Sequence, residues 1–218
     1  MTAFGYRKPA DLPRSIPLFP LPGAILFPRG VLGLNVFEPR YLNMVDDALG
    51  EERLIGMIQP AAGEEEDTAP NLAGVGAVGR ITSFTETDDG RYLIQLTGVC
   101  RFTLDQELEV ETPYRQALVD YDAFAGDFVE DPGLGIDREA LIASLHAYAV
   151  ANGFDVDWSA VEQAPTETII NVAAQICPFD SAAKQALLEA VTLEERCRAL
   201  IALVEWDAAA GGEGRPLQ

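Results

Sequence analysis

The first third of the chain consists of short apolar runs separated by prolines and glycines. Three such runs cover residues 16–19, 24–27 and 31–37. Proline cannot donate a hydrogen bond to a sheet and glycine permits the backbone angles of tight turns, so the pattern predicts short strands joined by turns. Residues 38–49 then show apolar positions at helical spacing and predict a short helix, and residues 53–59 predict a buried strand.

The clearest pattern is a hairpin of two long strands, residues 74–87 and 91–104. Asp89-Gly90 between them is typical of a two-residue type I′ turn. Apolar and polar residues alternate along the second strand, which predicts one dry face and one wetter face. Gly98 interrupts the dry face and predicts a bulge or bend that helps the sheet to curl.

One further strand is predicted at residues 114–121. Several short strands with almost no helix between them indicate a closed or nearly closed barrel of mostly antiparallel strands. Beyond an acidic, turn-rich stretch the periodicity is helical, which predicts a bundle of four main helices. The predicted fold class is therefore α+β, a small N-terminal β-barrel followed by a C-terminal helical bundle. We divide the chain into a flexible arm, the barrel, a linker, the bundle and a disordered tail, at residues 1–14, 15–122, 123–136, 137–207 and 208–218.

The composition indicates a folded protein with a strongly acidic surface. Hydrophobic residues make up 48% of the chain, and 15 basic residues against 35 acidic ones give a net charge of −20. Nucleic acids and anionic membranes attract clustered positive charge, and the sequence shows none, so we expect neither as a partner. No run reaches the ~20 apolar residues of a membrane span, and the N-terminus lacks an apolar signal segment. We therefore expect a cytoplasmic protein.

Residue types that carry chemistry are few. Cys100, Cys177 and Cys197 lack the paired spacing of zinc ligands or of a disulfide framework, so we interpret them as buried thiols. The single histidine, His146, lies on a predicted helix and is interpreted as a partly buried structural residue. The sequence has no P-loop, no G-x-S-x-G and no H-E-x-x-H motif. We therefore predict no catalytic, cofactor-binding or metal-binding residue, and no enzymatic activity.

Two short motifs imitate functional sites. Gly74, Gly76 and Gly79 form G-x-G-x-x-G, but they lie within a predicted strand and not between a strand and a helix, as a dinucleotide-binding loop requires. Ser181 and Lys184 lie three residues apart and resemble a Ser–Lys catalytic pair. Their helical context favours a helix cap for the serine and a surface charge for the lysine.

Five stretches, in one order along the chain, resemble the N-terminal, substrate-binding domain of the Lon protease family. The resemblance implies a PUA-like barrel and a non-catalytic module that captures unfolded or damaged proteins, with a separate ATP-dependent protease as a further partner. The family's full-length members also carry an ATPase module and a peptidase module, and neither follows the matching region of this sequence. The stretches are PLFPLPGAILFP, VFEPRYLNMV, VGRITSFTETDDGRYLIQLTGVCRF, PYRQALV and NVAAQICPFDSAAKQALLEAVTLEERCRALIALV, which together extend from Ile16 to Val204.

The apolar residues of the proline-rich stretch are the candidate peptide-binding surface, because an exposed apolar patch often marks a protein interface. The alternative is that they seal the barrel onto its helices. A second hypothesis for the whole chain is a small-molecule-binding or enzymatic barrel with a site at the barrel mouth or a domain groove. A closed pocket with convergent polar groups would favour that hypothesis, and an open apolar groove would favour peptide binding. The candidate surface comprises Phe19, Leu21, Ile25 and Phe27 of that stretch, together with Pro178 and Phe179, which lie at a corner of the predicted helical bundle and are expected to line the same groove.

Overall fold

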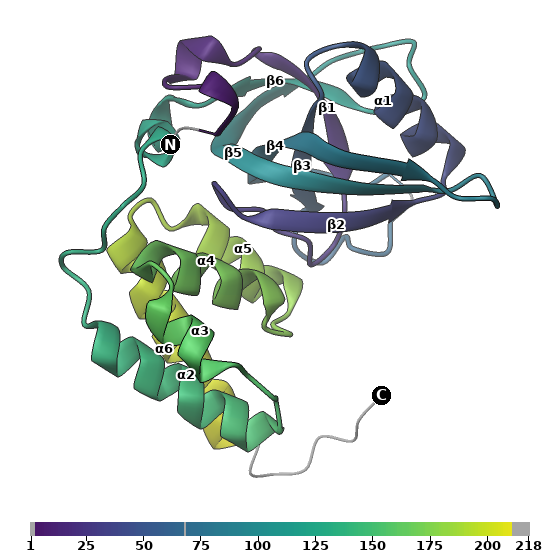
Figure 1. The fold of residues 1–218 in the computed structure, drawn as a ribbon. Coiled ribbons are helices and arrows are strands. Elements are labelled where there is room, and N and C mark those ends of the chain that lie inside the picture. The colour runs from purple at the N-terminus through teal and green to yellow at the C-terminus, as the bar shows by residue number, and fades with distance from the viewer. Residues whose placement is uncertain (1–2, 68, 211–218) are drawn as a thin grey trace. The chain divides into compact units, whose positions relative to one another are not determined.

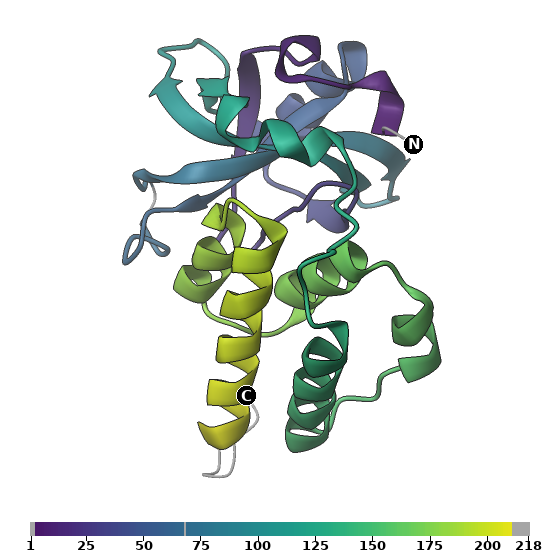
Figure 2. The ribbon, with the colours of Figure 1, turned by 90° about the vertical axis from the view of Figure 1, so that its left-hand side faces the viewer.

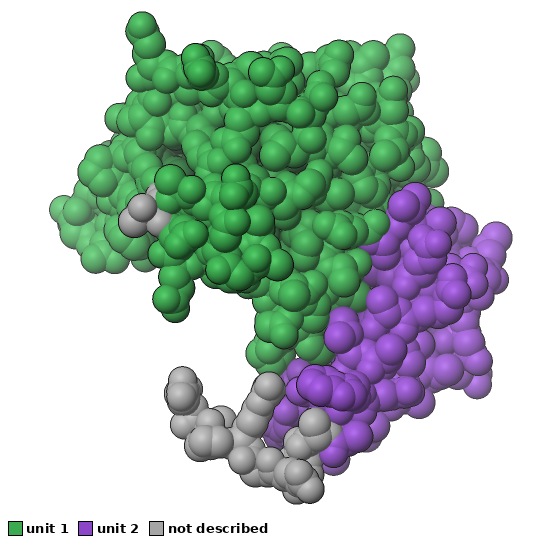
Figure 3. Space-filling view, turned by 180° about the vertical axis from the view of Figure 1, so that it is seen from behind, with its two compact units in different colours: residues 1–130, 178–189 green, residues 131–177, 190–218 purple. Residues whose placement is uncertain are grey.

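The chain folds into two compact units (Figure 1). The computed structural model describes residues 3–67 and 69–210. Unit 1 holds the described residues up to Glu130 together with Pro178–Glu189, and unit 2 holds Asp131–Cys177 and the described residues from Ala190 onward (Figure 3). Unit 1 contains the sheet and unit 2 is helical, which confirms the predicted α+β class.

Unit 1 is built on one six-stranded sheet. Its strands are β1 Ser15–Pro20, β2 Val31–Val36, β3 Leu54–Pro60, β4 Leu72–Glu86, β5 Tyr92–Glu107 and β6 Gln116–Asp120. They follow the order β2-β5-β4-β3-β1-β6, and β5 also pairs with β6, so that the pairing returns on itself (Figure 1). All pairs are antiparallel except that of β1 with β3. The first half of β5 pairs with β2 and its last residues pair with β6, which lets one long strand serve both sides of a curled sheet.

Residues 21–30, between β1 and β2, form an irregular loop in place of the predicted strand at 24–27. The loop packs directly on two glycines, Gly79 of β4 and Gly98 of β5, which pair with each other. A Cβ atom at Gly79 would lie 2.6 Å from the Leu26 side chain, and one at Gly98 would collide with the carbonyl oxygen of Phe27. Prolines near both ends of the loop remove ladder donors, which explains why its apolar residues are buried without forming a strand.

The bulge predicted near Gly98 is present. The register of β4 and β5 shifts between Val78 and Gly79, which pair with Cys100 and Gly98, so that Val99 is the extra residue. An extra residue in one strand bends that strand and increases its twist. The bulge therefore lies where β5 turns from its pairing with β2 to its pairing with β6.

Gly98→Ala is expected to destabilise unit 1 by about 3 kcal/mol, the upper end of the cost of an overpacked core. The reason is that the added methyl group meets a backbone carbonyl, which cannot rotate away as a side chain would. Urea denaturation measures the change. Gly126→Ala is the matched control, because a Cβ there meets nothing within 4 Å. An equal loss of unfolding free energy in the two variants would show that the close contact between Gly98 and the Phe27 carbonyl does not affect stability.

The turn between β4 and β5 differs from the predicted two-residue type I′ turn. Of residues 88–90, only Gly90 has a positive φ, 77°. Its N–H donates to the carbonyl oxygen of Thr87 at 2.9 Å, and Thr87 N–H donates to the carbonyl oxygen of Arg91. The connection is therefore a three-residue loop with one left-handed glycine, since a type I′ turn needs positive φ at both central residues.

Helix α1, Pro39–Gly50, agrees with the predicted helix at 38–49. Pro39 occupies the first helical position, where its missing N–H removes no helical hydrogen bond. The ring of Tyr41 stacks against Phe19 of β1, with ring centroids 4.2 Å apart. This contact fastens α1 to the sheet. The buried face of α1 consists of Tyr41, Met44, Val45 and Ala48.

The described part of the predicted flexible arm, residues 1–14, is packed on unit 1. Leu12 is buried in the core of the barrel-like sheet. The Tyr121 hydroxyl donates to the carbonyl oxygen of Pro13 at 2.8 Å, which fixes the chain just before β1. Residues 1–2 lie outside the described residues.

The first half of the predicted linker, residues 123–136, also packs on unit 1. It forms a 3-10 helix, Asp122–Phe128, whose Phe124 and Phe128 side chains join the core of the sheet. The division between the units falls later, after Glu130. The acidic, turn-rich composition of this stretch predicts a linker, but its buried aromatic residues hold its first half against the sheet.

Helix α5, Ser181–Glu189, groups with unit 1, whereas the predicted bundle at 137–207 included it. Leu187 and Leu188 are buried. Asp180 caps the helix, since its carboxylate accepts from Ala183 N–H at 2.7 Å. Helical periodicity alone could not distinguish a helix of the bundle from a helix packed on the sheet.

Unit 2 contains the helices α2 Arg138–Asn152, α3 Trp158–Gln163, α4 Thr166–Ile176 and α6 Leu193–Ala210. Helix α2 packs along α6, and α4 packs on α6 (Figure 2). Asp137 caps α2, because its side chain accepts from Ala140 N–H, and Thr192 and Glu195 form a reciprocal capping box at the start of α6. The helical spacing of Ile169, Ala173 and Ile176 predicts that Ile176 is buried, but it is 71% exposed. Most of the predicted tail, residues 211–218, lies outside the described residues. The buried face of α6 comprises Leu193, Cys197, Leu200 and Val204.

Candidate functional site

Three residues of the candidate peptide-binding surface are buried, so that prediction is wrong for them. Phe19 is 6% exposed, Ile25 is 1% exposed and Phe27 is 0% exposed. Phe19 lies in β1 and packs against Tyr41 of α1. Ile25 and Phe27 are buried in the loop at 21–30, which folds over Gly79 of β4 and Gly98 of β5. The other three keep some exposure: Leu21 and Phe179 are half-buried and Pro178 is exposed.

The loop at 21–30 is held by polar contacts at Gly23. Its N–H donates to Gln59 Oε1 at 2.8 Å, and its carbonyl oxygen accepts from Lys184 Nζ at 3.0 Å. Lys184 was predicted to be a surface charge, and instead it is half-buried against this loop. Its ammonium group fixes a backbone carbonyl, so the Ser181–Lys184 spacing serves the attachment of α5 to the loop.

Gln59 of β3 is a buried amide that connects the sheet to α5. Its Nε2 donates to the carbonyl oxygen of Ser181 at 3.1 Å and to Gln185 Oε1 at 3.0 Å. Gln185 Nε2 in turn donates to the carbonyl oxygen of Val75 on β4. Because a buried amide without partners costs free energy, this network favours one position of α5 on the sheet.

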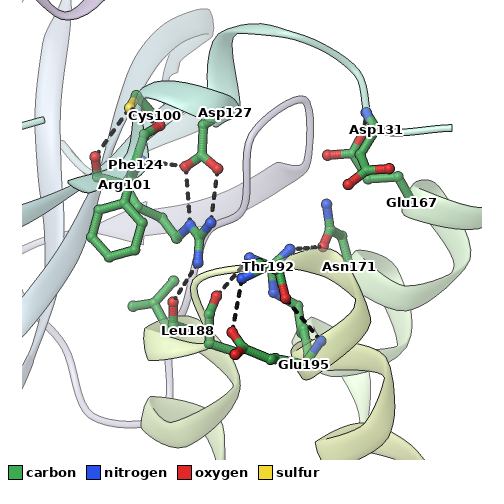
Figure 4. Close-up of polar contacts among 12 residues, drawn as sticks. Cys100, Arg101, Phe124, Asp127, Asp131, Glu167, Asn171, Leu188, Thr192 and Glu195 are labelled. Carbon is green, nitrogen blue, oxygen red and sulfur yellow. Dashed lines mark hydrogen bonds and ion pairs between the residues drawn. The ribbon is translucent and has the colours of Figure 1, made fainter. Parts of the chain in front are cut away.

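A buried ion pair holds the other end of α5 (Figure 4). Arg101 of β5 is 2% exposed and donates to both carboxylate oxygens of Asp127, from Nε at 3.0 Å and from Nη2 at 2.8 Å. Its Nη1 donates to the carbonyl oxygen of Leu188 at 3.0 Å, near the C-terminus of α5. The guanidinium carbon lies 4.3 Å from the centre of the Phe124 ring. One arginine therefore connects β5, the 3-10 helix and α5.

Unit 2 has its own buried arginine. Arg196 of α6 donates from Nη1 to Asn171 Oδ1 of α4 at 2.7 Å. Glu167, also on α4, accepts from the backbone N–H of Asp131 at 3.0 Å (Figure 4). These contacts fix α4 and the first residues of unit 2 within that unit. They are structural, since each group bonds to the protein's own backbone or side chains.

A groove of about 500 Å³ opens in unit 1 where β1 separates from β3. Pairing with β3 covers only Leu18–Pro20, whereas Ser15–Pro17 pair with β6 on the other side. Pro17 has no N–H, so the ladder between β1 and β3 lacks a donor at this residue. We call the place where β1 separates from β3 the fork. The first half of β1 forms one wall of the groove at this fork, and the other wall is the C-terminal end of α1 with the turn into β3.

Charged side chains line the groove. Asp47, Glu51, Glu52 and Arg53 line one wall of the groove, so this wall carries three negative charges and one positive charge. The Tyr114 hydroxyl donates to Asp47 Oδ2 at 2.7 Å. Burial and this hydrogen bond both raise the pKa of Tyr114 above its ordinary value, so the phenol stays neutral and acts as a donor. These residues are not among the predicted site residues, although Pro17 and the acidic end of α1 are signals in the sequence that could have indicated them.

A second, shallower hollow of about 380 Å³ lies on the outer face of β2, β5 and β4. The uncharged polar side chains of Asn35, Ser83, Thr85 and Gln95 line it, together with the apolar side chains of Leu34, Leu93 and Ile94. It carries no charged side chain and therefore offers no selection by charge.

The cysteines and the histidine do not line the groove between β1 and β3. All three cysteines are buried thiols, as predicted. Burial raises the pKa of the Cys100 thiol, and also that of Cys197, which disfavours the reactive thiolate. His146 is exposed, not partly buried, and its ring lies against Trp158. Within residues 3–67 and 69–210, no three or more His, Cys, Asp or Glu side chains are grouped so as to hold a metal ion. Over the same residues no helix is both long and apolar enough for a membrane span.

Curated relatives of the chain are Lon proteases. Lon protease 2 of Myxococcus xanthus is 30% identical over 200 residues, which cover 89% of this chain and 24% of that protein. Lon protease of Anaeromyxobacter dehalogenans is 33% identical over 134 residues, 60% of this chain and 16% of that protein. The chain therefore spans a quarter or less of the length of these relatives.

Two solved structures share the fold. The Lon N-terminal domain protein from Xanthomonas campestris superimposes with a TM-score of 0.57 at 23% identity, over 88% of this chain and 98% of that one. The N-terminal domain of the Mycobacterium avium complex Lon protease gives a TM-score of 0.63 at 16% identity, with the same coverage. Residues 15–205 match the family model described as the ATP-dependent protease La (LON) substrate-binding domain. The chain therefore belongs to the family of Lon substrate-binding domains.

Proposed function

We propose that this chain is a non-catalytic module that binds unfolded or exposed segments of other proteins. The observation that carries the proposal is the match of residues 15–205 to a family of substrate-binding domains. The family description names substrate binding, and we propose only this binding role for the chain and no catalytic step.

The side chains of unit 1 support a binding role over a catalytic one. Ser181 and Lys184 were the only pair in the sequence that resembled a peptidase centre. Ser181 lies at the start of α5 and Lys184 bonds to a loop carbonyl, so neither is arranged as a nucleophile or a base. The groove between β1 and β3 offers exposed carboxylates and a strand with an open side, which suit binding of a polar, extended chain.

Titration of labelled, unstructured peptides tests the proposal, with fluorescence anisotropy as the measurement and a single-stranded RNA of similar length as the control. We expect saturable binding of peptides and none of the RNA, because the net charge of −20 repels a phosphate backbone. Binding of neither probe, or of RNA alone, would refute the proposal.

We further propose that bound segments pass to an ATP-dependent protease. The matching relatives are themselves Lon proteases, which motivates this partner. In a degradation assay with a Lon protease of the same organism and an unfolded substrate, adding this chain is expected to change the rate of proteolysis. An unchanged rate over a wide range of chain concentrations would contradict delivery, and would leave peptide binding itself standing.

A further inference from the structure

We infer that the groove between β1 and β3 binds an extended segment that carries a lysine or arginine side chain. The inference rests on the proposed function and names the class of segment that this site selects. The two observations that carry it are the backbone of β1 at the fork and the charge of the opposite wall.

The backbone of β1 has an open side at the fork. Leu18 N–H donates to the carbonyl oxygen of Arg115, and Val119 N–H donates to that of Arg14, so the even-numbered residues of this segment direct their backbone groups toward β6. In an antiparallel pair, alternate residues face opposite edges. The N–H and C=O of Ser15 are therefore directed away from β6, toward the groove. Pairing with β3 starts only at Leu18, so these groups lie beyond that ladder.

An extended peptide can use such an edge. It adds beside a strand through main-chain hydrogen bonds, and its alternate side chains then point into adjoining pockets. Ser15 is an exposed residue and lines the groove, so a peptide in the groove lies beside this strand. The proline that opens the fork follows two residues later, which keeps the docking segment short.

The wall opposite β1 selects the charge of the segment. Asp47, Glu51 and Glu52 outnumber Arg53, so the lining carries a net charge of 1 − 3 = −2. The Tyr114 hydroxyl bonds to one oxygen of Asp47 and holds that carboxylate at the groove. A lysine or arginine side chain complements this wall, whereas an acidic side chain is repelled. The shallower hollow on β2, β5 and β4 lacks charge and cannot make this distinction.

The charge is tested with two labelled, unstructured peptides that differ only in lysine against glutamate at the same positions. Glu51→Gln/Glu52→Gln is expected to weaken binding of the lysine peptide by about threefold to tenfold, as two exposed ion pairs are worth little each. Glu65→Gln/Glu66→Gln removes the same net charge elsewhere in unit 1 and is expected to leave binding unchanged. Equal weakening by both variants, or by neither, overturns the inference.

The backbone contact is tested at Ser15. Ser15→Pro removes the N–H on the open side and is compatible with pairing to β6, since Pro17 already occupies an equivalent position in β1. We expect it to weaken peptide binding severalfold, while Ser15→Ala, which keeps the N–H, does not. Thermal unfolding by circular dichroism checks that both variants remain folded. Identical binding by the two variants would overturn docking at β1.

Failure of the proposed peptide binding and failure of the proposed groove give different results. If the unaltered protein binds no peptide at all, the proposed function is wrong. If it binds peptides but the groove variants behave like their controls, peptide recognition stands and this site does not.

Discussion

Asp127→Ala is expected to lower the free energy of unfolding of unit 1 by about 3–5 kcal/mol, the cost of leaving one charge of a buried ion pair without its partner. Asp127 is 8% exposed and accepts three hydrogen bonds from Arg101, two from the guanidinium and one from the backbone N–H at 2.9 Å. Without the carboxylate, the buried guanidinium loses its charged partner and keeps the uncharged Leu188 carbonyl oxygen as an acceptor. Because that carbonyl belongs to α5, the loss is expected to loosen α5 as well as β5.

The measurement is hydrogen exchange under increasing urea, read separately on peptides from β5 and α5. Tryptophan fluorescence does not serve here, because both tryptophans, Trp158 and Trp206, lie in unit 2. In the variant, β5 and α5 should lose protection at a lower urea concentration. A loss of less than about 1 kcal/mol would contradict the buried ion pair, since that is the typical worth of an exposed one.

A matched control is available on the same strand. Glu107 of β5 accepts from Arg115 Nε at 2.7 Å, and both side chains of that pair are partly exposed. Glu107→Ala is therefore expected to cost no more than about 1 kcal/mol. Arg101→Met/Asp127→Leu, which removes both charges, is expected to recover most of the stability lost in Asp127→Ala.

Phe27→Ala is expected to destabilise unit 1 by about 3–5 kcal/mol, the cost of removing a large buried aromatic side chain. Phe27 is fully buried, and its own carbonyl oxygen lies against Gly98, so the loop at 21–30 cannot shift easily to fill the space. The change is measured as the difference in urea midpoint of unit 1, followed by hydrogen exchange in β4 and β5.

The exposed-surface hypothesis gives the opposite expectation for Phe27. It predicts that replacing this residue removes peptide binding and leaves stability unchanged. Leu21→Ala, a half-buried residue of the same loop, is expected to cost only about 1 kcal/mol. A Phe27 variant as stable as the Leu21 variant would contradict the packing described here.

Alternating and helical periodicity predicted most of the elements of this fold, because one-sided burial imposes those periods directly. The strand predicted at residues 24–27 is wrong, because these apolar residues are buried in a loop. Hydrophobicity reports burial, whereas a strand also needs backbone partners, and the nearby prolines remove them. Periodicity also failed to place α5, because polar contacts of Gln59, Arg101 and Lys184 fix that helix in unit 1.

The candidate site was harder to predict for a related reason. Alternation placed Arg101 on the wetter face of β5, but it does not say which elements will cover that face. In the structure Asp127 and α5 cover it. The groove is lined by Ser15, Glu51 and Tyr114 among others. These residues are far apart in sequence and belong to no common motif, so the sequence does not indicate that they lie close together. Pro17, a proline within a strand, and the acidic residues at the end of α1 are the sequence signals that could have indicated this groove.

Recognition of unfolded polypeptide can be measured with one client protein in two states. A small, disulfide-bonded protein is titrated against this chain in its native form and in its reduced, permanently unfolded form, with calorimetry as the measurement. We expect saturable binding of the unfolded form and none of the native form. Equal affinity for both forms, or binding of the native form alone, would contradict this expectation.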